Sequence, residues 1–292
     1  MWITLAVFSA VCLGVYDIFK KTSLRGNNVL VVLLLNTMIG ALLMSPVVVG
    51  NIIDGSWGFG GDGMSHLRIL LKSAIVLSSW IMGYFAMKHM PLTIVGSINA
   101  TRPVLVLVGA LVIFGERLNA LQWVGIVLGF VSLLFISRIG RKEGFSLKHS
   151  RWIWLAMGAT VMGAVSGLYD KHLLRSLPAL EVQAWYSLYQ VVIMGATIFV
   201  LRRSRHADRT PFTWRWTIPC IAIFLTTADL AYFYCLSMPD AMISVVSMIR
   251  RGGVLVPFVY GAVVLREKNI GLKLIDLSIL LIALVLLVVA SQ

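Results

Sequence analysis

Long apolar runs are the feature that most constrains this chain. They recur along its 292 residues, and each is about long enough to cross a ~30 Å hydrocarbon core as a helix. Hydrophobic residues make up 59% of the chain and charged residues only 13%, too few to cover a water-soluble globule. We therefore expect an all-α polytopic membrane protein. The ten expected transmembrane helices span residues 3–19, 28–50, 67–87, 91–114, 118–138, 152–170, 182–202, 215–236, 240–265 and 270–290.

Motifs in the first half of the chain recur in the second half in the same order. The matched pairs are GVYDIFKKTSL at 14–24 with GLYDKHLLRSL at 167–177, YFAMKHMP at 84–91 with YFYCLSMP at 232–239, and GERLN at 115–119 with REKNI at 266–270. The pattern predicts two repeats of five helices, 1–142 and 143–292. Because five is odd, the second repeat must enter the membrane upside down. Inverted repeats of this kind are typical of secondary transporters.

The basic residues predict the orientation of the chain. Of 25 Lys and Arg, 17 fall in loops on one side of the predicted topology and five on the other. The basic side is expected to be cytoplasmic, so both termini should face outward from the cytoplasmic (inner) membrane. The net charge of +13 is spread over short loops instead of forming one face. We therefore expect no nucleic-acid partner.

Three arginines remain, and they lie inside apolar runs. Arg102 comes 11 residues after Pro91, and Arg250, which precedes Arg251, comes 11 residues after Pro239. At ~1.5 Å per residue this is about 16 Å along a helix, near the membrane midplane. A charge there costs at least ~2.5–3.5 kcal/mol on insertion scales. The arginines predict either a midplane site for an anion, shared by the two repeats, or internal salt bridges such as one to Asp229.

Other polar residues are weaker candidates for the same site. Asp229 is expected either to neutralise Arg250 or Arg251, or to carry a coupling proton. Asn99 precedes Arg102 by one turn and shares its face, and Tyr186 and Gln190 are further candidates to bind substrate. Polar side chains in membrane helices also hold helices together without touching any ligand.

The repeated Tyr–Asp pair marks two candidate gates. Tyr16 and Asp17 lie near the end of the first expected helix, and Tyr169 and Asp170 near the end of the sixth. The acids are either boundary residues, solvated or paired with Lys20, Lys21 or Lys171, or gate residues that pair with basic groups when their side closes. Glu116 and Glu267 are expected to be turn and capping groups.

The phrases PLTIVGSINATRPVLVLVGALVIFGERLNALQWVGIVLGF and REKNIGLKLIDL resemble the EamA domain of the drug/metabolite transporter superfamily. The resemblance implies ten helices around a central cavity and transport by alternating access. Phosphate translocators of this superfamily hold phosphate with a basic residue on the fourth helix and a consecutive basic pair on the ninth. Arg102 and the Arg250–Arg251 pair occupy those places, which makes the pattern similar to that sugar-phosphate branch.

These observations favour a secondary transporter of small organic anions, including phosphorylated metabolites. The alternatives are a carrier of neutral or zwitterionic metabolites such as amino acids, and drug efflux. An enzyme is not expected, because the sequence holds no P-loop, metal-ligand spacing or Ser/His/Asp arrangement. The expected partners are the lipid bilayer, a small-molecule substrate and a coupling proton or counter-substrate. No cofactor or metal is expected, and the sequence does not predict the oligomeric state.

Overall fold

The computed structural model describes residues 1–89, 98–99, 101–141, 151–203, 210–256 and 260, with short pieces between 275 and 290. The described helices are α1 (Trp2–Leu24), α2 (Val29–Ile53), α3 (Gly63–His89), α5 (Arg102–Phe114), α6 (Ala120–Arg141), α7 (Arg151–Leu173), α8 (Ala179–Arg203), α9 (Thr217–Ser237) and α10 (Ile243–Arg251), with 3-10 turns η1 (Phe59–Gly61) and η2 (Gly252–Val254). These residues form helices and no strand, and the predicted all-α fold class is confirmed.

The outer surface of the bundle is apolar, as lipid contact requires. Five of the described helices, namely α1, α2, α3, α7 and α9, are long and apolar enough to cross a membrane. Leu42, Val112 and Phe199 are 70%, 79% and 67% exposed, which suits hydrocarbon and not water. Most of the predicted helix 270–290 and the start of the predicted helix 91–114 lie outside the described residues.

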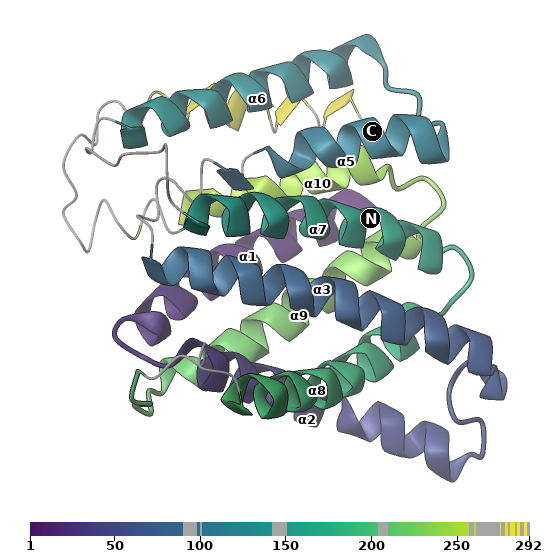
Figure 1. Cartoon of the computed structure of the whole chain (residues 1–292). Helices are drawn as coiled ribbons and strands as arrows, with labels where there is room; N and C mark the ends of the chain where they lie inside the picture. The colour runs from purple at the N-terminus through teal and green to yellow at the C-terminus, as the bar shows by residue number, and fades with distance from the viewer. Residues whose placement is uncertain are drawn as a thin grey trace.

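The helices pack in pairs, each of which joins a helix from the first half of the chain to a helix from the second half. α1 packs along α9, and its counterpart α7 packs along α3, while α2 packs against α8 (Figure 1). Each of the first two pairs carries the same kind of polar contact. Ser9 Oγ donates to Ala228 O at 2.7 Å, and Ser79 Oγ donates to Ala159 O at 2.7 Å. The α1–α2 connection and the α7–α8 connection lie at opposite ends of the bundle, as inverted repeats require (Figure 1).

Helix α1 and turn η2 approach so closely that glycine is required on both. A Cβ on Gly14 would overlap the carbonyl oxygen of Gly253, and a Cβ on Gly253 would overlap the carbonyl oxygen of Ala10. Because lipid tails are as apolar as the helices, association in a membrane depends on close packing of this kind and on interhelical hydrogen bonds. The crossing fixes the end of α10, and therefore the two arginines there, against α1.

The buried apolar side chains form two large clusters, one toward each end of the bundle. One surrounds Ile69, Leu173 and Phe233 near the α7–α8 connection. The other surrounds Leu33, Tyr84 and Ile218 near the α1–α2 connection. We call these two ends the α7–α8 end and the α1–α2 end.

The turn between α9 and α10 is held from two sides at the α7–α8 end. Lys171 Nζ donates to Leu236 O at 3.2 Å and to Ala241 O at 2.6 Å. The Glu116 carboxylate accepts from Ile243 N at 2.7 Å and also bonds Ser244. Glu116 therefore caps α10, a helix from the other half of the chain. Glu267 lies outside the described residues.

Outside the membrane-spanning helices, Asp62 begins α3. Its carboxylate accepts from the Ser65 hydroxyl at 2.6 Å and from the backbone amides of Met64 and Ser65 at 3.1 Å. These hydrogen bonds lower the pKa of Asp62 because they favour its charged form. The cap starts α3 four residues before the predicted span, which places Lys72 further from the start of the helix.

Candidate substrate site

Arg102 is the first residue of α5 and lies across helix α7. One guanidinium nitrogen, Nη2, donates to Gly163 O at 2.5 Å. The plane of the group covers Gly163 so closely that a Cβ there would lie 2.9 Å from Arg102 Cζ. Among the described residues, no acid pairs with this guanidinium and no second hydrogen bond reaches it. Most of its five donors are therefore left for a ligand or for water.

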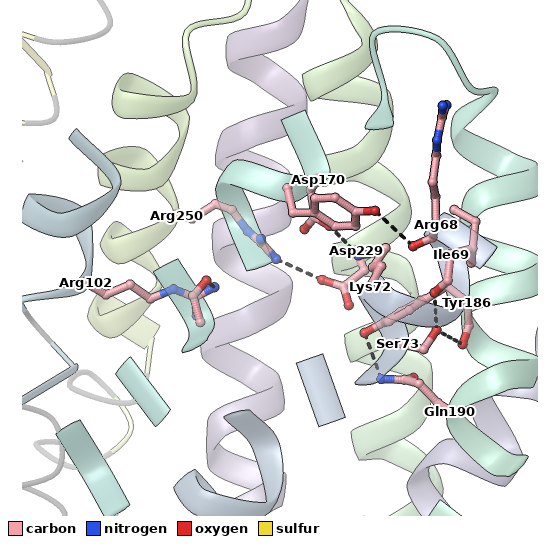
Figure 2. Close-up of polar contacts among 12 residues, drawn as sticks. Arg68, Ile69, Lys72, Ser73, Arg102, Asp170, Tyr186, Gln190, Asp229 and Arg250 are labelled. Carbon is pink, nitrogen blue, oxygen red and sulfur yellow. Dashed lines mark hydrogen bonds and ion pairs between the residues drawn. The ribbon is translucent and has the colours of Figure 1, made fainter. Parts of the chain in front are cut away.

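Arg250 reaches the middle of the bundle from the last turn of α10. Its Nη2 lies 3.0 Å from Asp229 Oδ1, and its Cζ lies 3.9 Å from the centre of the Tyr232 ring. The salt bridge that the sequence left open as an alternative is therefore present for Arg250. Asp229 and Arg250 are mostly buried, with side chains 14% and 16% exposed. Figure 2 shows Arg102 and Arg250 extending toward the side of the bundle on which Asp229 lies.

We call Arg102, Arg250 and Arg251 the arginine cluster. Arg251 lies within electrostatic range of Arg102 and Arg250, and of Asp17 on α1. It makes no hydrogen bond to another described residue. Of the three guanidinium groups, Arg250 alone forms an ion pair within the described part of the chain. The helix geometry changes beside the cluster, since α5 begins at Arg102 and η2 follows Arg251.

At the α7–α8 end, Asp170 is 5% exposed and forms an ion pair that sequence analysis missed. Lys72 Nζ of α3 lies 2.5 Å from Asp170 Oδ1. The same Nζ lies 4.2 Å from the centre of the Tyr186 ring and 4.5 Å from that of Phe233. The boundary interpretation of Asp170, in which it is solvated or pairs with Lys171, is wrong because the group is buried and its partner is Lys72. Close by, Tyr169 donates to Arg68 O at 3.3 Å.

At the α1–α2 end, the matching acid Asp17 is exposed. The hydroxyls of Tyr16 and Tyr84 lie 3.4 Å apart. Lys20 Nζ lies 4.3 Å from the centre of the Tyr84 ring and interacts electrostatically with Asp17. The two Tyr–Asp pairs thus lie at opposite ends of the bundle in different surroundings: Asp170 is in a buried ion pair, and Asp17 is exposed.

A small pocket lies between α2, α3, α8 and α9. Three predicted site residues, Tyr186, Gln190 and Asp229, line it. The other lining residues are Asn36, Thr37, Gly40, Trp80, Gln183, Ser187, Leu225 and Thr226. Within the pocket wall, Gln190 Nε2 donates to the Tyr186 hydroxyl at 2.9 Å.

The remaining predicted residue, Asn99, lies away from this pocket. Its Oδ1 accepts a hydrogen bond from the Thr160 hydroxyl at 2.9 Å, which ties the segment before α5 to α7. Apart from Asn99, the residues predicted to bind substrate therefore fall into two neighbouring groups, the arginine cluster and the pocket. The Arg250–Asp229 pair connects them, because Asp229 also lines the pocket (Figure 2).

Both the sequence and the fold were compared with those of known proteins. Residues 1–138 match the EamA-like transporter family. The first half of the chain is thus similar to an EamA-like transporter domain, the resemblance that its sequence motifs indicated.

The fold also occurs among solved structures, of which 28 chains match. One of them, described only as "Crystal structure of protein", superposes with a TM-score of 0.73. It covers 97% of this chain and 95% of its own length at 14% sequence identity, and this likeness concerns the fold alone. No curated protein matches the sequence.

Proposed function

We propose that this protein is a secondary carrier that moves a small organic anion across the cytoplasmic membrane, and that the arginine cluster binds it. The observation that carries the proposal is the uneven pairing of deep charges. Arg250 is matched by Asp229, and Lys72 by Asp170. Arg102 has no acid partner among the described residues, and Arg251 shares Asp17 with Lys20.

Guanidinium groups without an acid partner near a membrane midplane are energetically costly, so their presence calls for an explanation. A guanidinium remains charged at any physiological pH and presents a planar fork that fits carboxylate or phosphate oxygens. A bound anion would supply the missing counter-charge and several hydrogen bonds at once. Arg102 and Arg251 together suit a dianion, such as a phosphate monoester or a dicarboxylate, better than a single carboxylate.

The two halves, 1–142 and 143–292, are proposed as the bodies that alternate the access. On the positive-inside orientation, the α7–α8 end faces outward and the Lys72–Asp170 pair closes it. The Tyr16–Asp17 region would then form the inner gate. A proton or a counter-substrate would drive the cycle, with Asp229 as the candidate proton carrier.

A second candidate is a carrier of zwitterionic metabolites such as amino acids. It is favoured by Asp229, because only its Oδ1 is used by Arg250 and the side chain lines the pocket. In that case Arg102 would bind a carboxylate and Asp229 an ammonium group. The two candidates differ in the net charge of the substrate.

The direct test is counterflow in proteoliposomes that contain the purified carrier. Vesicles are preloaded with one unlabelled compound at a time from a fixed set, namely inorganic phosphate, glycerol 3-phosphate, succinate, alanine and glycerol, and uptake of the same labelled compound is followed. The proposal expects exchange of at least one anion and none of glycerol. Exchange of alanine alone would favour the second candidate, and no exchange of any anion would overturn the first.

A further inference from the structure

The pocket holds two buried carboxamides that make no hydrogen bond to any described residue. Asn36 on α2 and Gln183 on α8 are each 2% exposed. Asn36 Oδ1 and Gln183 Oε1 are both buried without a hydrogen bond, and both residues line the pocket. No other hydrogen bond of either carboxamide occurs among the described residues. Buried polar groups are almost always satisfied, so two orphans in one pocket wall call for an explanation.

The neighbouring polar groups do not donate a hydrogen bond to Asn36 Oδ1 or Gln183 Oε1. The Thr37 hydroxyl donates to Leu34 O, the Ser187 hydroxyl donates to Gln183 O, and the Gln190 amide donates to Tyr186. Asp229 uses only Oδ1 for Arg250, so its Oδ2 is a third acceptor without a bond to a described residue. The buried atoms that lack a hydrogen bond are therefore two amide oxygens, and the Asp229 carboxylate adds a third acceptor. The amide nitrogens of Asn36 and Gln183 also bond no described residue, but they are not among the buried unpaired atoms.

From this arrangement we infer that the pocket is a second subsite for the same substrate, and that it takes a hydrogen-bond-donating end, a hydroxyl or an ammonium group. The inference rests on the proposed function, in which the arginine cluster holds the anionic end. The Arg250–Asp229 pair places the two subsites side by side (Figure 2). The substrate would then be a compact molecule with an anionic end and a donor end.

The alternative explanation is a structural one, in which water completes the hydrogen bonds of the two amides and stabilises the fold. Apolar replacements of nearly the same shape distinguish the structural explanation from the ligand-binding one. Asn36→Leu and Gln183→Met keep the side-chain volume and remove the orphan groups. If the amides serve a ligand, the ligand-free variants unfold at the same temperature as the wild type or higher, because an unsatisfied buried polar group is itself costly.

Asn27→Leu is the matched control for the stability measurement. Asn27 is 0% exposed, but its carboxamide is fully used: Nδ2 donates to Thr213 O at 2.8 Å, and Oδ1 accepts from Thr213 N and Asn28 N. The control should lower the unfolding temperature and leave ligand preference unchanged. A fall for Asn36→Leu and Gln183→Met as large as that of Asn27→Leu would assign the two amides to the fold and overturn the inference.

Ligand preference is measured as thermal protection of the detergent-purified protein by two probe series. The first is propionate, lactate and alanine, and the second is ethyl phosphate, 2-hydroxyethyl phosphate and phosphoethanolamine. In at least one series, the donor-bearing probes should bind the wild type about 10-fold more tightly than the donor-free probe, a difference of ~1.4 kcal/mol. Asn36→Leu and Gln183→Met should remove that difference and leave binding of the donor-free probe unchanged.

The outcomes also separate this inference from the proposed function. If no donor-bearing probe exceeds its donor-free analogue, or if both variants keep the preference, the subsite does not exist. Binding of ethyl phosphate or propionate that depends on Arg102 would then leave the anion proposal standing. The converse outcome is that Arg102→Ala keeps the wild-type affinity for anions while the donor-bearing probes are still preferred. That result would support the pocket as a subsite and refute the proposal that the arginine cluster binds the anion. Preference for the ammonium member, lost in Asp229→Asn, assigns the donor as an amine, whereas preference for the hydroxyl member assigns an alcohol.

Discussion

Lys72 of α3 and Asp170 of α7 form a buried ion pair 2.5 Å long, with side chains 1% and 7% exposed. Replacing Lys72 by Met leaves the Asp170 carboxylate buried without a partner. Breaking such a pair costs about 3–5 kcal/mol, so thermal unfolding of Lys72→Met should occur well below that of the wild type. The double variant Lys72→Met/Asp170→Asn should recover most of this loss. A double variant no more stable than Lys72→Met would mean that Lys72 acts through its aromatic contacts instead.

The same pair predicts how access changes. If it closes the α7–α8 end, a cysteine at Ile69, one turn before Lys72 and 0% exposed here, should become reactive when the pair is broken. A cysteine at Asp17 should become less reactive under the same conditions. Labelling of the detergent-purified protein with a thiol reagent measures both, on a background in which the three native cysteines are replaced. Changes of the same sign at the two positions would contradict a two-gate mechanism.

Gly163 is predicted to position Arg102. A methyl group there would meet the guanidinium at 2.9 Å, and the side chain would have to swing away from the Gly163 carbonyl. Gly163→Ala should fold normally, because the far end of a flexible side chain moves at little cost. Its affinity for the transported anion should fall about 10-fold, or ~1.4 kcal/mol. Gly195→Ala, where nothing lies within 4 Å of the added carbon, is the control and should transport like the wild type.

The Arg250–Asp229 pair predicts an asymmetry between neighbouring arginines. Arg250→Ala should unfold at a lower temperature, since it strands Asp229. Adding Asp229→Asn should restore part of the loss. Arg251→Ala breaks no direct ion pair with a described residue and should lose substrate affinity with little change in stability. Equal destabilisation by Arg250→Ala and Arg251→Ala, measured by thermal unfolding in detergent, would refute this division of roles.

The positive-inside orientation predicts that both termini face away from the cytoplasm. Alkaline phosphatase fused after Gln292 should be active, because it folds only outside the cytoplasm, and a green fluorescent protein fusion at the same place should be dark. The reverse result would exchange the inner and outer gates and leave the binding sites unchanged.

The sequence showed that three arginines lie inside long apolar runs, where charges are costly and need partners, and it left a salt bridge to Asp229 open as one of two explanations. The structure shows that bridge for Arg250. Lys72 was missed for a geometric reason. From the sequence, the third helix is expected to begin at residue 67, which leaves Lys72 near the membrane surface, but the Asp62 cap starts α3 at Gly63. Lys72 therefore lies nine residues into the helix, about 13 Å deep along its axis.

The pocket could be predicted only in part. Tyr186, Gln190 and Asp229 were candidates, and Asn36 is a visible polar residue in an apolar run. Gln183 gave no signal, because it lies in the second turn of α8, where a polar residue at the membrane surface is ordinary. That it meets Asn36 in one pocket wall depends on how α2 packs against α8, a relationship that residue spacing along either helix does not contain.

The central claim is that Arg102 binds the anionic end of the transported molecule, and exchange kinetics of Arg102 variants test it most directly. The anion that exchanges fastest in the wild type is assayed in proteoliposomes containing Arg102→Ala or Arg102→Lys. Charge-assisted hydrogen bonds contribute ~1.5–3 kcal/mol each. Arg102→Ala should therefore raise the half-saturating concentration about 10- to 100-fold. Arg102→Lys keeps the charge but loses the planar fork, and should fall between Arg102→Ala and the wild type. Wild-type affinity in a normally folded Arg102→Ala carrier would contradict the claim.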